Sequence, residues 1–143
     1  MKFLPLLKEI VRSYQAFDSY SAPHIKSMDL TPPQFDVIAT LGNQPPMTCK
    51  TLGDKTLITK GTLTGILDRL EIKGIIQRST NEEDARSQKI ALTTAGQVIF
   101  ERAFPAHMQH LEKAFNQLSP QQMVDLTSSL KQLRESIEKL ATP

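Results

Sequence analysis

Cysteine and tryptophan are almost absent from this sequence: its 143 residues include one cysteine, Cys49, and no tryptophan. A single cysteine excludes an intramolecular disulfide and is typical of a reducing compartment. Long apolar runs are also missing, because the N-terminal stretch at residues 3–7 is followed at once by Lys8 and Glu9. That stretch is too short for a signal-peptide core or a membrane span. We therefore expect a cytoplasmic protein without a membrane partner.

The excess of charge is small, and sequence motifs of catalysis are missing. Lys and Arg number 17 against 15 Asp and Glu, a formal net charge of +2, so only the distribution of charge can point to nucleic acid. The sequence contains no G-x-S-x-G elbow, no phosphate-binding glycine loop and no H-E-x-x-H pattern. At this length we expect one domain, residues 1–143, that is not an enzyme and needs no cofactor.

The most informative segment is residues 48–87. Its helix is predicted at about residues 60–73, with Thr59 as the N-cap and Gly74 as the stop signal. Apolar residues recur there at i, i+3, i+4 and i+7 and predict a buried stripe: Leu63, Ile66, Leu67 and Leu70. The opposite face is small and polar, which suits close approach to another surface: Gly61, Thr64, Gly65 and Asp68.

Two shorter helices are predicted upstream of this one. Residues 31–34 (Thr-Pro-Pro-Gln) form a capping signal for a helix with inward Phe35, Ile38 and Leu41 that ends at Gly42. Thr48 is expected to cap a helix over about residues 49–55, whose inward residue is Leu52. That helix, the turn to residue 59 and the helix at 60–73 predict a helix-turn-helix.

Strand patterns follow, over residues 75–78 and 88–92, and the polar segment 79–87 between them has the character of an exposed β-wing. A two-stranded hairpin is marginal alone and should pack on the helices. The wing contains Glu82, Glu83 and Asp84, which should repel a phosphate backbone. A plain solvated loop is therefore an alternative interpretation.

Both chain ends predict amphipathic helices. One runs from Pro5 to about Tyr20, and Pro23 interrupts or kinks it. Another is capped by Thr93 or Thr94 and bends around Pro105, with apolar residues Val98, Ile99, Phe104, Met108, Leu111, Phe115 and Leu118. The last begins at residues 119–122 (Ser-Pro-Gln-Gln) and carries an a/d rhythm: Met123, Leu126, Leu130, Leu133, Ile137 and Leu140. We infer a helical lobe shared between two subunits; an intramolecular bundle is the alternative.

Three segments occur here in a characteristic order: residues 70–78 (Leu-Glu-Ile-Lys-Gly-Ile-Ile-Gln-Arg), 84–87 (Asp-Ala-Arg-Ser) and 92–96 (Leu-Thr-Thr-Ala-Gly). Together with the order of the helices they resemble the MarR family of bacterial winged-helix regulators. Gly53 and Ala85 depart from the family pattern, which more often has alanine and a basic residue at these two positions. Glycine weakens a helix interior by roughly 1 kcal/mol against alanine.

The resemblance implies a mainly α fold with a small β-wing. It divides the chain into a winged helix-turn-helix lobe, residues 30–93 (helix-turn-helix about 48–73, wing about 75–92), and a dimerisation lobe formed by the terminal segments 1–28 and 94–143. The implied function is a sequence-specific transcriptional regulator, a repressor, that binds a palindromic operator in double-stranded DNA as a homodimer. A small aromatic or anionic effector would release it.

Site residues follow from this resemblance and from the polarity of the segments. We expect Lys60, Thr62 and Thr64 at base edges or nearby phosphates, and Thr48, Lys50 and Thr59 at phosphates. Arg86, followed by Ser87, is expected at the minor groove, and Asp84 is expected to shape the wing so that Arg86 is held outward. Arg69 and Arg78 fit either a structural role or a phosphate contact.

The regulatory input has several candidates. By resemblance, an effector cleft could be lined by Tyr14, Phe17, Tyr20 and His24, although aromatic residues at helical spacing also suit core packing. Cys49, near a helix N-terminus, fits either a redox role or an inert small residue. His107 and His110 could bind a metal together with Glu112 or His24, but they also suit an exposed polar face, and we predict no metal site.

A protein-interaction module that dimerises without specific DNA binding is the alternative function. Such a module would expose apolar anchors on the helix at residues 60–73. Ile72 is the exposed apolar candidate there.

Overall fold

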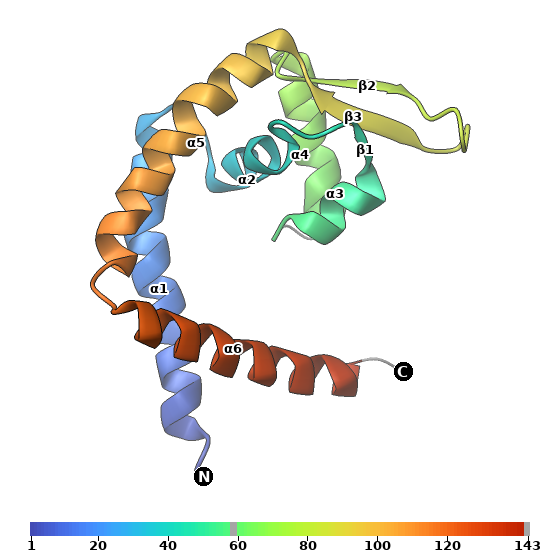
Figure 1. The fold of residues 1–143 in the computed structure, drawn as a ribbon. Helices are drawn as coiled ribbons and strands as arrows, with labels where there is room; N and C mark the ends of the chain where they lie inside the picture. The colour runs from blue at the N-terminus through green and yellow to red at the C-terminus, as the bar shows by residue number, and fades with distance from the viewer. Residues whose placement is uncertain (58–59, 142–143) are drawn as a thin grey trace. The chain divides into compact units, whose positions relative to one another are not determined.

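The computed structural model describes residues 1–57 and 60–141, without the side chains of residues 60 and 61. The chain divides into two compact units, residues 1–107 and residues 108–143. The elements (Figure 1) are, in order, α1 (Leu4–Ser27), α2 (Pro32–Leu41), β1 (Met47–Thr48), α3 (Cys49–Lys55), α4 (Lys60–Ile72), β2 (Ile76–Thr80), β3 (Gln88–Leu92), α5 (Thr94–Phe115) and α6 (Pro120–Ala141). The fold is mostly helical with one small antiparallel sheet, as predicted.

Helices α2, α5 and α6 begin at side-chain caps that the sequence predicts, as does α3, whose cap is described below. At α2 the Thr31 hydroxyl accepts the Gln34 N–H (3.3 Å), and the Gln34 side chain accepts the Thr31 N–H (3.1 Å). Ser119 and Gln122 form the same reciprocal pair at α6, at 2.8 and 3.1 Å. Thr93 caps α5 by accepting the Gly96 N–H at 3.1 Å. These bonds satisfy backbone donors that a helix start leaves unpaired.

Helix α4 ends as its glycine predicts. Gly74 has φ +73°, a left-handed conformation that side chains disfavour. Its N–H donates to the Glu71 carbonyl, and the Ile75 N–H donates to the Leu70 carbonyl, both at 2.9 Å. This pair of bonds closes the helix in a Schellman motif and turns the chain into the sheet.

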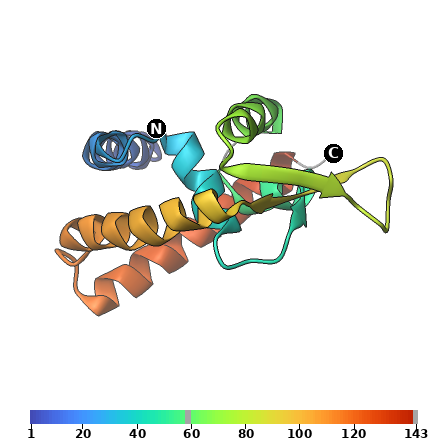
Figure 2. The same cartoon turned by 90° about the horizontal axis from the view of Figure 1, so that it is seen from above.

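The sheet has three antiparallel strands in the order β1-β3-β2. In the hairpin, Arg78 of β2 pairs with Ile90 of β3, and on the other edge of β3 Met47 of β1 pairs with the same Ile90. Figure 2 shows the hairpin of β2 and β3 extending away from the neighbouring helices. Residue 75 is not part of β2, the hairpin turn is shorter than predicted, and the two-residue strand β1 was not predicted at all.

The core of the first unit lies between the winged-helix elements. Every apolar residue of the stripe predicted on α4 is buried, as are the inward residues predicted on α2 and α3: Leu63, Ile66, Leu67, Leu70, Phe35, Ile38, Leu41 and Leu52. Gly42 lies against the ring of Phe100, where an added Cβ would come within 2.2 Å of ring carbons. The first half of α5 is thereby packed closely against the end of α2.

Two predictions about the terminal helices are wrong. Helix α1 does not end near Tyr20, because it continues through Pro23 to Ser27. Proline removes one backbone donor, but buried Ser21 and Ile25 hold this end of the helix in the core. Helix α5 runs through Pro105, where a bend was predicted, and its buried residues are Gly96, Phe100, Ala103 and His107, whereas Val98 of the predicted apolar set is exposed.

Large apolar side chains on α1 and α6 are exposed in the single chain. The stripe predicted on α1 is exposed at Leu4, Leu7, Ile10, Val11, Tyr14 and Phe17, and that on α6 at Leu126, Leu130, Ile137 and Leu140. Helix α6 has no buried residue among those described. None of the helices in the described part of the chain combines the length and apolar character that crossing a membrane requires.

Candidate nucleic-acid interface

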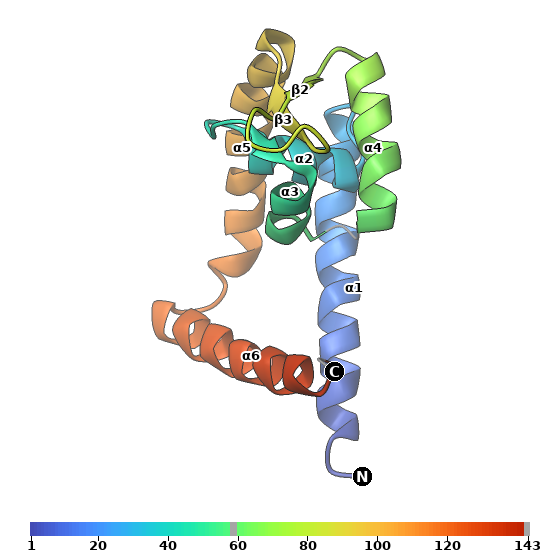
Figure 3. The same ribbon diagram turned by 90° about the vertical axis from the view of Figure 1, so that its right-hand side faces the viewer.

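A hollow of about 850 Å³ lies on the first unit between the helix-turn-helix and the wing. Its walls come from the start of α3, the exposed face of α4, strand β2 and the wing turn. Seen along the hairpin, α4 lies to one side of the strands (Figure 3). The residues that line it and carry the argument below are Thr48, Lys50, Thr64, Asp68, Arg78 and Arg86.

The outer face of α4 is polar, as predicted. Thr62, Thr64, Gly65 and Asp68 are all exposed on it, opposite the buried apolar stripe. Thr64 and Asp68 line the hollow. The side chains of Thr59 and Lys60, which we predicted at the N-cap and at DNA, lie outside the described residues.

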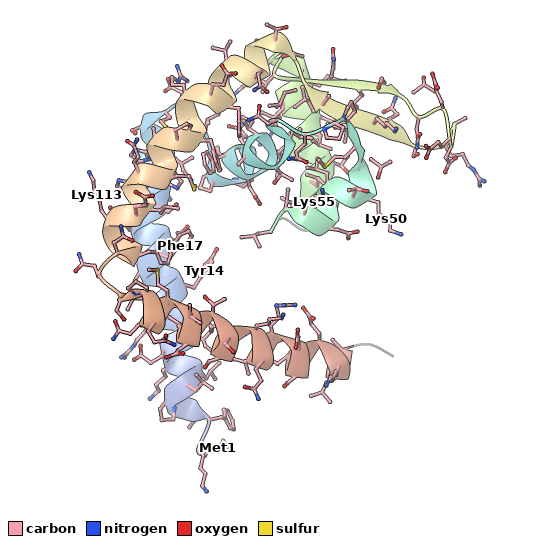
Figure 4. The ribbon with its side chains drawn as sticks, viewed as in Figure 1. Met1, Tyr14, Phe17, Lys50, Lys55 and Lys113 are labelled. Atoms are coloured by element: carbon pink, nitrogen blue, oxygen red, sulfur yellow. The ribbon has the colours of Figure 1, made fainter. Side chains whose placement is uncertain are left out.

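Helix α3 presents its N-terminus to the hollow. The Thr48 hydroxyl accepts the Thr51 N–H at 3.1 Å, so Thr48 caps the helix as predicted. Lys50 is exposed and projects outward from α3 (Figure 4). Cys49 is half-buried and lies in the wall of the hollow. The hollow is therefore lined by a capped helix start, a hydroxyl and an amine on this side.

Hydrogen bonds of polar side chains shape the wing turn. The Asp84 carboxylate accepts the Arg86 backbone N–H at 3.0 Å, while its distance to the Arg86 Nε is 3.8 Å. Asn81 is buried; its amide nitrogen donates to the Ser87 hydroxyl (2.9 Å) and its amide oxygen accepts the Glu83 N–H (3.2 Å). The Arg86 side chain is 97% exposed at the end of this framework.

Asn81 is a residue that the sequence interpretation missed. Its signal was present, because asparagine bonds readily to the backbone two residues ahead and so favours turns, and Glu83 lies two residues after it. Ser87, predicted at DNA, directs its hydroxyl into the turn, where the Asp84 carbonyl lies 3.3 Å away. Wing conformation therefore depends on three polar residues, Asn81, Asp84 and Ser87.

Arg78 faces α4. Its Nη2 lies 2.9 Å from a carboxylate oxygen of Asp68, and its Nη1 lies 3.4 Å from one of Glu71. The two carboxylates are one helical turn apart, so a single guanidinium spans both. The sequence left two roles open for Arg78, a structural role and a phosphate contact. The observed ion pairs are those of the structural role.

The segment before α4 is tied to α2. The Leu57 N–H donates to the Asp36 carboxylate at 2.9 Å. Burial raises the pKa of Asp36 above its ordinary value of 3.8, and the bond from Leu57 lowers it by a smaller amount. This bond fixes the chain close to where α4 begins.

The predicted effector residues lie on α1. Tyr14 and Phe17 are exposed in the single chain, which contradicts their interpretation as core residues of one chain, and both project from α1 (Figure 4). Tyr20 and His24 are half-buried. The structure therefore does not gather the four side chains into one enclosed site within the single chain.

His107 is not a surface residue, contrary to one interpretation of the sequence. It is 2% exposed, and its Nε2 and Nδ1 lie 2.9 Å from the Ser21 hydroxyl and from His24 Nδ1 respectively. The ring of Phe35 packs edge-on against it. No group of three or more His, Cys, Asp or Glu that could hold a metal occurs among the described residues. The histidine pair joins α1, α2 and α5.

The fold and this interface define a winged helix-turn-helix protein. The model of the MarR family matches residues 30–88, and the chain belongs to that family. It is 30% identical over 126 residues to the homoprotocatechuate degradative operon repressor of Escherichia coli, covering 88% of this chain and 82% of that protein. It is 32% identical over 119 residues to the organic hydroperoxide resistance transcriptional regulator of Bacillus subtilis, covering 82% and 78% respectively.

A solved structure of a MarR variant from Escherichia coli in complex with operator DNA is also similar. It shares 26% sequence identity, with a TM-score of 0.81, over 92% of this chain and 95% of that chain. The homologues are helix-turn-helix transcriptional regulators, some of them repressors, and not enzymes.

Proposed function

We propose that this protein is a transcriptional repressor that binds a palindromic operator in double-stranded DNA as a homodimer. The observation that carries the proposal is the hollow between α4 and the wing, where a small polar helix face lies beside an arginine that is 97% exposed. A helix with a polar, sterically small face fits the major groove. An exposed guanidinium fits the negative potential of an adjacent narrow minor groove.

We assign individual roles from the side-chain positions of the described residues and, for Lys60 and Thr59, from the sequence alone. Thr62 and Thr64, with Lys60, would contact base edges or nearby phosphates from α4. Thr48, Lys50 and Thr59 would contact phosphates at the start of α3 and ahead of α4. Arg86 would enter the minor groove. Asp84 and Ser87 would hold the wing turn in shape, because both bond within that turn.

A homodimer accounts for the exposed apolar side chains of the terminal helices. The stripes on α1 and α6 include aromatic and leucine residues that a soluble monomer would expose to water. A second copy that covers them would form the proposed dimerisation lobe from residues 1–28 and 94–143. Two-fold symmetry then places two α4 helices about 34 Å apart, in successive major grooves of a palindrome.

Release by a small aromatic or anionic effector is the remaining part of the proposal. Tyr14 and Phe17 are exposed in one chain, and Tyr20 and His24 are half-buried nearby along α1. A second chain against α1 would enclose these rings and create an apolar site with polar groups, the composition that small ligands prefer.

The experiment is selection of duplexes from a random double-stranded DNA library by the purified protein. The proposal predicts enrichment of one palindrome, bound by two chains, and displacement from it by some members of a phenolic acid panel. The variant Thr64→Ala should relax selection at one base pair in each half-site. Lys131→Ala, which removes an exposed lysine from α6, is the matched control and should select the wild-type palindrome. Absence of any enriched sequence would contradict the proposal.

Protein binding in place of DNA binding has less support. Among the described residues beside α4, the exposed large apolar ones are Leu57 and Ile72. They lie beyond one end and at the other end of a helix that spans about 20 Å, so they do not form one contiguous anchor. The same selection experiment decides between the two functions, since a protein-interaction module would enrich no DNA.

A further inference from the structure

Arg78 lies on the inward face of its strand. The burial pattern of β2 alternates, with Ile76 buried, Gln77 exposed and Arg78 partly buried. Residues two apart in a strand share a face, so Arg78 follows Ile76 on the side that packs on α4. Its side chain is 20% exposed. An arginine placed on this face cannot extend freely toward solvent as Arg86 does.

The guanidinium of Arg78 is held by two carboxylates of the recognition helix. Nη2 lies 2.9 Å from Asp68 and Nη1 lies 3.4 Å from Glu71. Both terminal nitrogens therefore contact α4, at the wall of the hollow that Arg78 helps to line. Because one planar group contacts two residues a helical turn apart, the contact restrains both the distance and the direction of β2 relative to α4.

The same contact changes the charge of the interface. Asp68 lines the hollow, and its side chain is 56% exposed. A carboxylate at that position would repel a phosphate backbone. Arg78 places a positive charge directly on it, so that the helix face carries less negative potential toward an approaching duplex.

We propose that Arg78 is a positioning residue for DNA binding, and that it contacts no DNA itself. It sets the wing hairpin on the recognition helix so that Arg86 and the polar face of α4 meet one duplex together. This inference rests on the proposed function, since it assigns a role within DNA binding. It differs from a phosphate-contact role, in which the guanidinium would leave the two carboxylates and bind the backbone.

The test uses the full-length variants Arg78→Ala, Arg78→Lys, Asp68→Ala and the double variant Arg78→Ala/Asp68→Ala, with Arg86→Ala as the matched loss of an arginine. The first readout is hydrogen exchange of backbone amides in the free protein. The second is affinity for the palindrome that the wild type selects, measured over a range of salt concentrations.

The positioning role predicts faster exchange in β2 and β3 for Arg78→Ala and for Asp68→Ala, with α6 unchanged, and partial recovery in Arg78→Lys. Affinity should fall about fivefold in Arg78→Ala, because this variant loses two partly exposed ion pairs and a loss of that size corresponds to about this factor in the binding constant. The slope of log affinity against log salt should change by less than the roughly 0.9 for each chain that a lost phosphate contact gives, because no phosphate contact is lost. Asp68→Ala should also weaken binding although it removes a negative charge, and the double variant should be no weaker than Arg78→Ala.

A phosphate contact predicts the opposite pattern. Arg78→Ala would then lower the salt slope by about 0.9 for each chain, the change also expected of Arg86→Ala, and Asp68→Ala would strengthen binding. That result, or unchanged exchange in the hairpin of Arg78→Ala, overturns the inference. A wild type that selects no DNA overturns the proposed function instead, and exchange in the free protein still decides whether Arg78 holds the hairpin.

Discussion

Replacing Arg86 by alanine tests the wing most directly. The side chain is 97% exposed, and its one ion-pair partner, the Asp84 carboxylate, lies 3.8 Å from its Nε. The side chain therefore has little packing to lose, and thermal stability should stay within the small range typical of surface substitutions. Asp84 bonds to the Arg86 backbone N–H, a contact that alanine keeps, so the turn should also keep its shape. Any loss of affinity then reports on DNA contact.

The magnitude follows from counterion release. Each phosphate neutralised by a protein contributes about 0.9 to the slope of log affinity against log salt. A homodimer presents two copies of Arg86, so Arg86→Ala should lower the slope by about 1.8. Between about 50 and 200 mM salt, this difference makes the affinity loss about tenfold larger at the low end of the range than at the high end.

Fluorescence anisotropy of the labelled palindrome, titrated at several salt concentrations, measures that slope. Arg86→Lys should keep it, because the positive charge remains, whereas Lys131→Ala on α6 should leave both slope and affinity unchanged. If Arg86→Ala binds with the wild-type slope, the wing arginine does not neutralise phosphate and the proposed position of the wing at the duplex is wrong.

Three further predictions concern the chain itself. Gly53→Ala should raise the free energy of unfolding by about 0.4–1 kcal/mol, since a Cβ there would lie at an ordinary contact distance of 3.6 Å from Leu63. Urea unfolding measures this change. In the same assay Gly42→Ala should be destabilising, because its Cβ would come within 2.2 Å of the Phe100 ring. Asp36→Asn should raise the melting temperature near neutral pH. The folded chain holds the Asp36 proton more tightly than the unfolded chain does, so the contribution of Asp36 to stability falls as pH rises from 3.8 through the raised pKa. Melting curves of both proteins from acid to neutral pH should show the gain of the variant over the wild type vanish below that window. Leu130→Glu, on the exposed stripe of α6, should dissociate the proposed dimer in sedimentation, while the exposed polar change Gln132→Glu should not.

Local signals in the sequence predicted most of the fold. Matched caps such as Thr31 with Gln34 and Ser119 with Gln122 act over three residues, and so they determine where a helix begins without help from the rest of the chain. The 3.6-residue periodicity of α4 likewise identified its buried side. Gly74 marked the end of that helix, because its conformation is one that glycine adopts readily.

Features that depend on distant contacts were not predictable in the same way. Strand β1 has two residues, too few to show a period, and exists because it pairs with β3. Pro23 did not end α1, since tertiary packing of Ile25 outweighs the loss of one backbone bond. His107 is buried through partners 83 and 86 residues away in sequence, and the contacts of Arg78 with α4 depend on how β2 packs.

Strand β3 lies between β1 and β2, and its two pairings hold different parts of the candidate interface. Lys89 of β3 pairs with Ser79 in the hairpin and with Thr48, the residue that caps α3. Strand β2 of the wing and strand β1, which leads into α3, are thus both paired with β3. Residues 81–87 at the tip of the wing belong to no strand. Under the proposed function, insertions or deletions in the tip would change how far Arg86 extends along a duplex, while the strand registers that hold α3 stay the same. On the proposed function, the reach of the wing and the base contacts of α4 could therefore change independently.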